Sequence, residues 1–182
     1  MRNPIFGRLI AAFSVGVVAL FCIGSAYAET NNTTNPCVGA DPCLILVRHA
    51  EKVDSSEDPD LSPAGLARAA LLADVLEERG ILLTGIHATD YIRTRDTAAP
   101  SAEAAGLPVQ LYDPSDLEGF AGVAQALSGI HLIVGHSNTT PQLAELLGAP
   151  EDSVQMAYDT YNLIVVLAYG EGDDPVLTLL TF

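Results

Sequence analysis

The feature that most constrains the fold is a regular alternation of short apolar runs with segments of helical character. Apolar runs of this kind predict strands, and the first four are 44–47, 85–88, 108–112 and 131–134. Two later runs, 161–170 and 175–182, have only a turn-like "EGDD" between them and predict a hairpin. We therefore expect an α/β fold. It is a three-layer sandwich with a mostly parallel sheet, helices on both faces and an antiparallel C-terminal edge.

Start and stop signals support the predicted helices. The four helical segments are 61–80, 91–106, 116–128 and 138–148. In the first of them Ser62 is placed to cap the helix, Pro63 occupies its first turn and Gly80 closes it. In the second, Pro100 is expected to kink or restart the helix. The predicted strands and helices fill one domain over 44–182, with no internal repeat.

The N-terminus has the pattern of a targeting segment. Two arginines and no acidic residue precede an apolar run at 9–23, and "AYA" at 26–28 is a small-x-small cleavage site. We interpret 1–28 as a signal peptide, which predicts export to the periplasm or the extracellular space. An uncleaved membrane anchor is the alternative, but the apolar run is short for a span of roughly 20 residues.

A polar segment over 29–43 carries the two remaining cysteines, Cys37 and Cys43. In an oxidising compartment they are candidates for a small-loop disulfide that ties this segment to the first strand. Two unpaired thiols are the alternative. A zinc site is disfavoured, because no histidine or third cysteine lies nearby in the sequence.

The chain is strongly acidic, with 23 acidic against 8 basic residues and a formal net charge of −15. Such a surface argues against nucleic acid and anionic lipid as partners. Membrane contact is expected only through the signal segment, if that segment stays uncleaved.

Against this acidic background, cationic side chains gather at predicted strand ends. Arg48 and His49 follow the first strand, Arg93 opens the helix after the second, and His136 follows the fourth. Taken singly, each residue also fits a structural role. Because ligands of open α/β sheets bind at the carboxyl ends of the strands, the residues together predict a cationic pocket suited to a phosphoryl group. His87 and His131 lie within predicted strands, and we expect them to be structural.

Three stretches give the chain a family resemblance. "LVRHAEK" at 46–52, "TDYIRTRDTA" at 89–98 and "VGHSNTT" at 134–140 occur in this order. Together they resemble the histidine phosphatase superfamily, which has the phosphoglycerate mutase-like fold. The resemblance covers roughly 44–170. The chain lacks long insertions over the site, as does the short SixA-like branch of the family, so the resemblance implies an open pocket.

The resemblance implies roles for four residues. His49 is the expected nucleophile, and Arg48, Arg93 and His136 are expected to bind the phosphate. Arg93 matches the family arginine because it stands four residues before a Thr-Ala pair, whereas Arg95 does not. No metal and no other cofactor are expected.

The residue that protonates the leaving group stays open. Family members commonly use a carboxylate on the loop after the third strand, where this chain offers Asp113, Asp116 and Glu118. Asp113 is nearest the strand end, and Glu118 is nearest the spacing of the mutases, whose full pattern is absent. Glu51 and Lys52 are placed either to contact substrate or to lie in a solvated loop.

These observations predict a metal-independent phosphomonoester hydrolase that forms a phosphohistidine on His49. One alternative is a phosphoprotein or phosphohistidine phosphatase. The other is a catalytically weak domain that binds an anion or a partner protein. The expected partner is a small phosphorylated substrate or a phosphoprotein.

Overall fold

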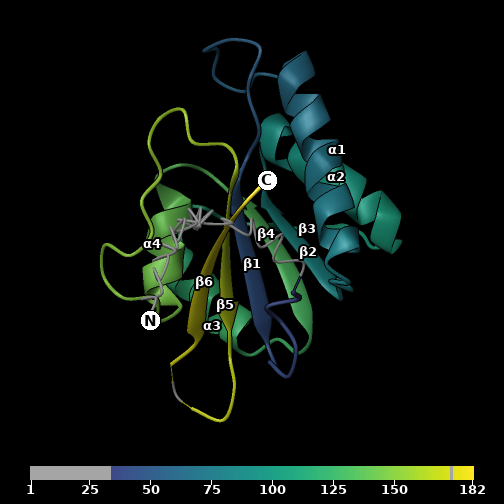
Figure 1. Cartoon of the computed structure of the whole chain (residues 1–182). Coiled ribbons are helices and arrows are strands. Elements are labelled where there is room, and N and C mark those ends of the chain that lie inside the picture. Colours follow the sequence, from purple (N-terminus) through teal and green to yellow (C-terminus); the bar gives the residue numbers. More distant parts are fainter. Residues whose placement is uncertain (1–33, 173) are drawn as a thin grey trace, which may run out of the picture. The chain divides into compact units, whose positions relative to one another are not determined.

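The computed structural model describes residues 34–172 and 174–182, and these residues are built around a six-stranded sheet (Figure 1). The predicted signal segment, 1–28, lies outside the described residues. The strands are β1 Cys43–Arg48, β2 Gly85–Thr89, β3 Val109–Tyr112, β4 Ile130–Gly135, β5 Leu163–Ala168 and β6 Val176–Thr181. Their order across the sheet is β3-β2-β4-β1-β5-β6.

The strand pairing is parallel on one side of the sheet and antiparallel on the other. β2 pairs in parallel with both β3 and β4, and β4 pairs in parallel with β1. β5 runs antiparallel to β1, and β6 runs antiparallel to β5. The hairpin of β5 and β6 needs no crossover helix, whereas each parallel pairing does. The predicted sheet, with its antiparallel C-terminal edge, is confirmed.

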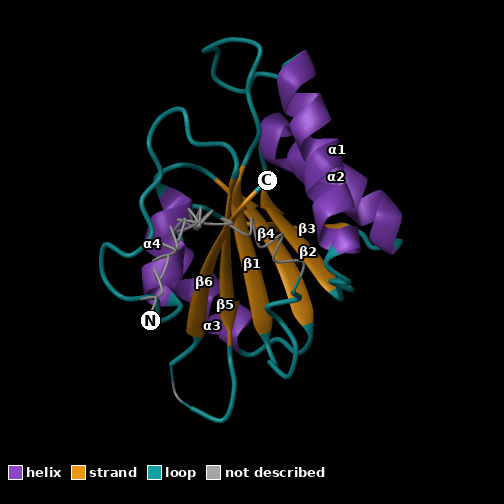
Figure 2. Cartoon of the chain, in the orientation of Figure 1, coloured by secondary structure: helices purple, strands orange, loops and turns teal. Residues whose placement is uncertain are grey.

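Helices cover both faces of the sheet. Figure 2 shows α1 (Pro63–Glu78) beside α2 (Ile92–Ala105), and α3 (Leu117–Gln125) with α4 (Thr139–Leu146) on the other side. None of the helices in the described ranges has the length and apolar character that a membrane crossing requires.

The side-chain alternation of β1 explains why two helical layers can form. Ile45 and Val47 belong to the core cluster that α1 and α2 complete, whereas Leu44 and Leu46 belong to the cluster that α3 and α4 complete. Successive residues of a strand point to opposite faces of the sheet, so a continuous apolar strand contributes buried side chains to both faces. The three-layer sandwich is confirmed.

The helix ends follow their sequence signals, with one exception. The Ser62 hydroxyl accepts a hydrogen bond of 3.1 Å from Gly65 N, and Gly106 closes α2 with φ of 66°. Pro100 lies inside α2 without restarting it, because the helix continues from Ile92 to Ala105. A proline lacks its N–H and its ring crowds the carbonyl four residues before it, so the helix continues through it at a cost that packing must offset.

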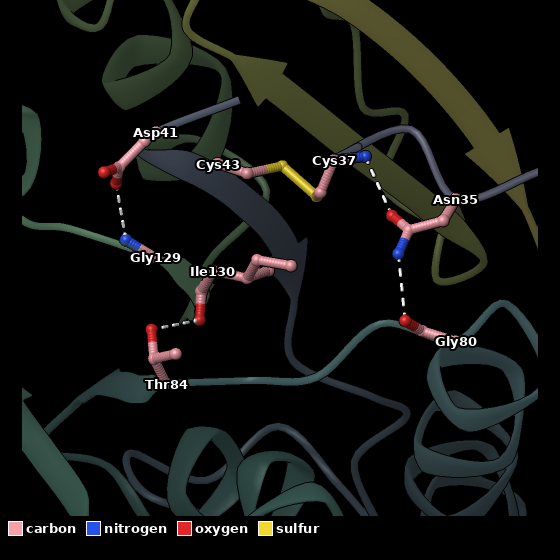
Figure 3. Close-up of a disulfide and its surroundings, with 8 residues drawn as sticks. All are labelled: Asn35, Cys37, Asp41, Cys43, Gly80, Thr84, Gly129 and Ile130. Atoms are coloured by element: carbon pink, nitrogen blue, oxygen red, sulfur yellow. Dashed lines mark hydrogen bonds between the residues drawn. A yellow bond between two sulfur atoms is a disulfide. The ribbon is translucent and has the colours of Figure 1, made fainter. Parts of the chain in front are cut away.

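The described part of the polar N-terminal segment is fastened to the domain (Figure 3). Cys37 and Cys43 form a disulfide, with 2.00 Å between the sulfur atoms. The Asn35 side-chain amide donates to Gly80 O at 2.9 Å, and the Asp41 carboxylate accepts from Gly129 N at 2.7 Å. The segment is therefore tied to the end of α1 and to the start of β4.

Candidate active site

The four residues predicted to act on phosphate line one pocket of about 460 Å³ at the carboxyl ends of the parallel strands. Arg48 is the last residue of β1 and is paired in register with Gly135 of β4, so His49 and His136 follow neighbouring strands. Their ring centroids are 5.4 Å apart, in an edge-on arrangement. Arg93 reaches the same pocket from the first turn of α2.

His49 is held as one tautomer by the backbone. Its Nδ1 lies 2.7 Å from Ala50 O. Because a carbonyl oxygen only accepts, Nδ1 carries the proton and Nε2 keeps its lone pair. The pKa of His49 is lowered to about 3, mainly by burial and also by the charges of His136, Arg48 and Arg93, whereas the hydrogen bond to Ala50 O acts in the opposite direction. The ring is therefore neutral near pH 7, which is the form that a nucleophile needs.

Arg48 is buried and holds a turn of the chain from its Nη1 nitrogen. This nitrogen donates to the backbone oxygens of Ala157, Tyr158 and Thr160 at 3.2, 2.7 and 3.2 Å. The guanidinium also stacks on the Tyr161 ring, 4.1 Å from its centroid. Its Nε is buried and has no hydrogen-bond partner within the described residues.

Arg93 is held in a similar way from another loop. Its Nη1 lies 3.3 Å from the Asp58 carboxylate and 3.4 Å from Glu57 O, and its guanidinium stacks on Tyr91 at 4.3 Å. Its Nε is also buried and finds no partner in the part of the chain that the structure describes. Arg95 lies outside the pocket lining, with a side chain 41% exposed and paired with Asp90.

His136 completes the cationic side of the pocket. Its Nε2 lies 3.0 Å from Thr89 Oγ1, and its ring meets the Tyr91 ring edge-on at 5.0 Å. Burial lowers the pKa of His136 to about 4, and Arg93 and Arg48 act in the same direction. A bound phosphoryl group brings negative charge and opposes these effects, so it favours the imidazolium form, which donates hydrogen bonds.

None of the carboxylates considered as proton donors lines this pocket. Asp113 is exposed and accepts two hydrogen bonds from Ser115, which lower its pKa. Asp116 caps α3 by accepting from Gly119 N, and Glu118 is exposed in the first turn of that helix. The loop contributes Pro114 and Ser115 to the lining instead. Among the described residues, the lining contains no Asp or Glu.

Of the other residues considered from the sequence, one lines the pocket and the rest lie outside its lining. Lys52 lines the pocket, whereas Glu51 forms a two-pronged ion pair with Arg68 on α1. His87 and His131 are buried away from the lining, with 3.2 Å between His87 Nε2 and His131 Nδ1. Within the described ranges, no group of three His, Cys, Asp or Glu side chains is arranged to hold a metal.

Three tyrosines at the pocket were not among the residues predicted from the sequence. Tyr91 and Tyr158 line the pocket, and Tyr161 stacks on Arg48. Tyr91 lies within the stretch 89–98, two residues before Arg93. The other two tyrosines lie in an irregular segment before β5, where neither periodicity nor spacing distinguishes them.

The first two stretches behind the family resemblance lie within a range that matches a known family. The histidine phosphatase superfamily (branch 1) matches residues 44–114, which include Arg48, His49 and Arg93. Over this range, which is less than half of the chain, the sequence is similar to that superfamily. His136 lies beyond the matched range, and its place in this pocket comes from the structure. No curated protein sequence matches the chain.

Solved structures resemble the fold of this domain. SixA from Agrobacterium tumefaciens is 22% identical, with a TM-score of 0.59 over 78% of this chain and 98% of that one. The protein histidine phosphatase SixA complexed with tungstate is 14% identical, with a TM-score of 0.61 over 76% and 96%. Phosphoserine phosphatase from Entamoeba histolytica is 16% identical, with a TM-score of 0.57 over 78% and 97%. At these identities the likeness shows the phosphoglycerate mutase-like fold.

Proposed function

We propose that the protein is a metal-independent phosphatase that forms a phosphohistidine on His49. The similarity of residues 44–114 to the histidine phosphatase superfamily supports a phosphatase function. One observation carries the proposal. Neutral His49, with a free Nε2, lines the same pocket as Arg48 and Arg93, and the described lining contains no carboxylate. Each arginine has a buried Nε without a partner among the described residues. Buried cationic donors without partners are costly unless an anion binds them.

In the first step, His49 Nε2 attacks the phosphorus atom in line with the bond to the leaving group. A P–N bond forms, and the leaving atom departs with the bonding electron pair. Arg48, Arg93 and protonated His136 bind the equatorial oxygens, whose charge is spread in the transition state. Ala50 O holds the Nδ1 proton, which stabilises the positive charge that develops on the ring.

In the second step, water attacks the same phosphorus from the side that the leaving group has vacated. The P–N bond breaks, its electron pair returns to Nε2, and inorganic phosphate leaves. Water loses a proton to solvent or to phosphate, so His49 is restored in its neutral form.

The pocket favours substrates whose leaving group departs without being protonated. Because its described lining offers no carboxylate, an alkoxide finds no carboxylic acid there to protonate it. A phosphohistidine, an acyl phosphate or an aryl phosphate releases a weaker base and is expected to react faster. This feature favours phosphoprotein or phosphohistidine substrates as the second candidate within the same chemistry. Tyr158, 77% exposed at the rim, leaves the pocket accessible to a large partner.

Turnover of p-nitrophenyl phosphate by the purified protein tests the activity, with His49→Ala as the inactive control. A panel with an alkyl phosphate, acetyl phosphate and a phosphohistidine peptide then ranks the leaving groups. We expect turnover that falls as leaving-group basicity rises. A protein that binds phosphate but turns over none of these substrates would be the weakly catalytic anion-binding domain instead.

We also propose that residues 1–28 direct export and are removed. The Cys37–Cys43 disulfide supports an oxidising compartment. Fractionation of cells that express the full chain, with the mass of the exported protein, tests this. A cytosolic protein that still carries residue 1 would contradict it.

A further inference from the structure

The two arginines of the pocket are anchored at the same nitrogen. Arg48 Nη1 donates to the turn that contains Tyr158, and Arg93 Nη1 contacts the Asp58 carboxylate and Glu57 O. A guanidinium is a rigid plane whose Nε and Nη2 form the edge away from Nη1. In Arg93, anchoring at Nη1 therefore leaves the edge that can bind two phosphate oxygens at once. In Arg48, Nη2 also donates to the Tyr161 hydroxyl at 3.4 Å.

The anchor of Arg93 comes from a loop outside the family stretches. Asp58 lies between β1 and α1, on a loop that is closed by a hydrogen bond of 3.0 Å from Val53 N to Asp60 O. The Asp58 carboxylate oxygen that contacts Arg93 also accepts from Ile92 N at 2.9 Å. Ile92 is the first residue of α2, and the residue before it, Tyr91, provides no side-chain cap.

Asp58 thus caps the N-terminus of α2 in place of Tyr91 and contacts Nη1 of Arg93. Its place is set by the backbone of α2, and its side chain is 36% exposed and does not line the pocket. A carboxylate that occupied the position of the substrate anion would instead lie inside the pocket. The contact therefore holds the guanidinium without blocking it.

We propose that Asp58 is a positioning residue that aims the Nε–Nη2 edge of Arg93 at the phosphoryl group. This rests on the proposed function, because it assumes that Arg93 binds phosphate. Asp58 itself does not line the pocket, and its contact with the site is through Arg93. Its charge also acts to raise the pKa of His136.

The chain offers a matched control on the same helix. Asp90 pairs with Arg95 much as Asp58 pairs with Arg93, but the Asp90–Arg95 pair lies outside the pocket lining. Asp58→Ala is expected to lower kcat/KM for p-nitrophenyl phosphate and to weaken orthovanadate binding by about tenfold, the scale of one charge-assisted hydrogen bond. Asp90→Ala is expected to change both by less than about twofold, as for an exposed ion pair.

Two further variants separate positioning from a merely structural role. Asp58→Asn keeps an oxygen that accepts from Ile92 N and Arg93, so it is expected to restore orthovanadate affinity to within about threefold of wild type. In an Arg93→Ala background, Asp58→Ala is expected to cost less than about twofold more, because the residue through which it acts is gone. Thermal unfolding of each variant shows how much the loss of the α2 cap lowers stability.

Three results would overturn the assignment. Asp58→Ala could match Asp90→Ala, its effect could persist in full in the Arg93→Ala background, or it could tighten orthovanadate binding, which would make Asp58 a competitor of the anion. Because orthovanadate binding needs no turnover, wild-type protein that binds it without hydrolysing phosphoesters contradicts the proposed function alone. Wild-type protein that binds neither phosphate nor orthovanadate contradicts both.

Discussion

The backbone N–H of Ala50 donates a hydrogen bond of 2.9 Å to the hydroxyl oxygen of Thr97. The same hydroxyl donates to Arg93 O at 2.7 Å. Thr97 is buried, so this two-sided contact fixes the residue after His49 to the helix that carries Arg93. The proposed nucleophile and one of its arginines are thereby placed by a single side chain that lies outside the pocket lining.

Replacing Thr97 by valine should loosen this connection. The change keeps the shape but leaves the Ala50 N–H buried and unpaired, which costs about 1–3 kcal/mol of the free energy of unfolding. We expect kcat/KM to fall by on the order of tenfold, because the distance between His49 and Arg93 is no longer held. Thr97→Ser is the control that keeps the hydroxyl. Urea unfolding and steady-state kinetics measure both effects, and native values for Thr97→Val would refute the role.

His49→Ala should abolish turnover while the fold is retained. In wild-type protein, rapid quenching with labelled substrate should trap an adduct that is labile in acid and stable in base, as expected for a phosphohistidine. Peptide mapping should place this label on His49, whose Nε2 is the nitrogen left free by the bond to Ala50 O. Label on His136 or on a serine would show that the nucleophile is misassigned.

Arg93→Ala should lower kcat/KM by on the order of a hundredfold or more, the scale of losing one charged donor to the transition state. Lysine at this position should rescue only in part, since a point charge cannot reproduce a two-pronged grip. Arg95→Ala should cost little, because Arg95 is paired with Asp90 outside the pocket. Steady-state kinetics of the three variants decide this, and equal losses at both positions would contradict the assignment.

Activity should survive exhaustive treatment with a chelator. The fixed charges of Arg48 and Arg93 are expected to do what a divalent ion does elsewhere, namely offset charge on the equatorial oxygens. Orthovanadate, which mimics the five-coordinate transition state, should inhibit. Loss of activity with chelator that returns on addition of Mg²⁺ or Zn²⁺ would show that the chemistry depends on a metal.

Stability should fall in acid before the carboxylates are protonated. Burial lowers the pKa of His87 from 6.5 to about 4, and an unfolded histidine titrates near 6.5. Between these values the unfolded chain binds more protons than the folded one. The free energy of unfolding therefore decreases as pH falls from about 6.5 towards 4. His49 and His136, with pKa values of about 3 and 4, act in the same direction.

Urea unfolding at a series of pH values measures this slope. His87→Gln removes one titrating group from the buried pair with His131 while keeping a hydrogen-bond donor. This variant should show a shallower decrease than wild type over the same window. An identical pH dependence would mean that His87 is not among the groups responsible.

Local sequence patterns determined most of the fold. Apolar runs and helix-end signals such as Ser62 and Gly106 act over a few residues, so they do not depend on the rest of the chain. The strand ends then determined where Arg48, His49 and His136 lie, because parallel strands present their carboxyl ends at one edge of the sheet. The choice of Arg93 over Arg95 rested on family spacing, and the structure places Arg93 in the pocket.

The tertiary structure alone decided how these residues are held. Arg48 binds a turn 109 to 112 residues later in the chain, and Arg93 is anchored by Asp58 across 35 residues. It also decided that Asp113 and Glu118 lie outside the pocket lining. Such contacts depend on the paths of irregular loops, which are set by packing between distant segments and leave no period or spacing in the sequence. The sequence by itself therefore determined which groups meet at the sheet edge, and the packing of the loops decided which donor edges stay free for an anion.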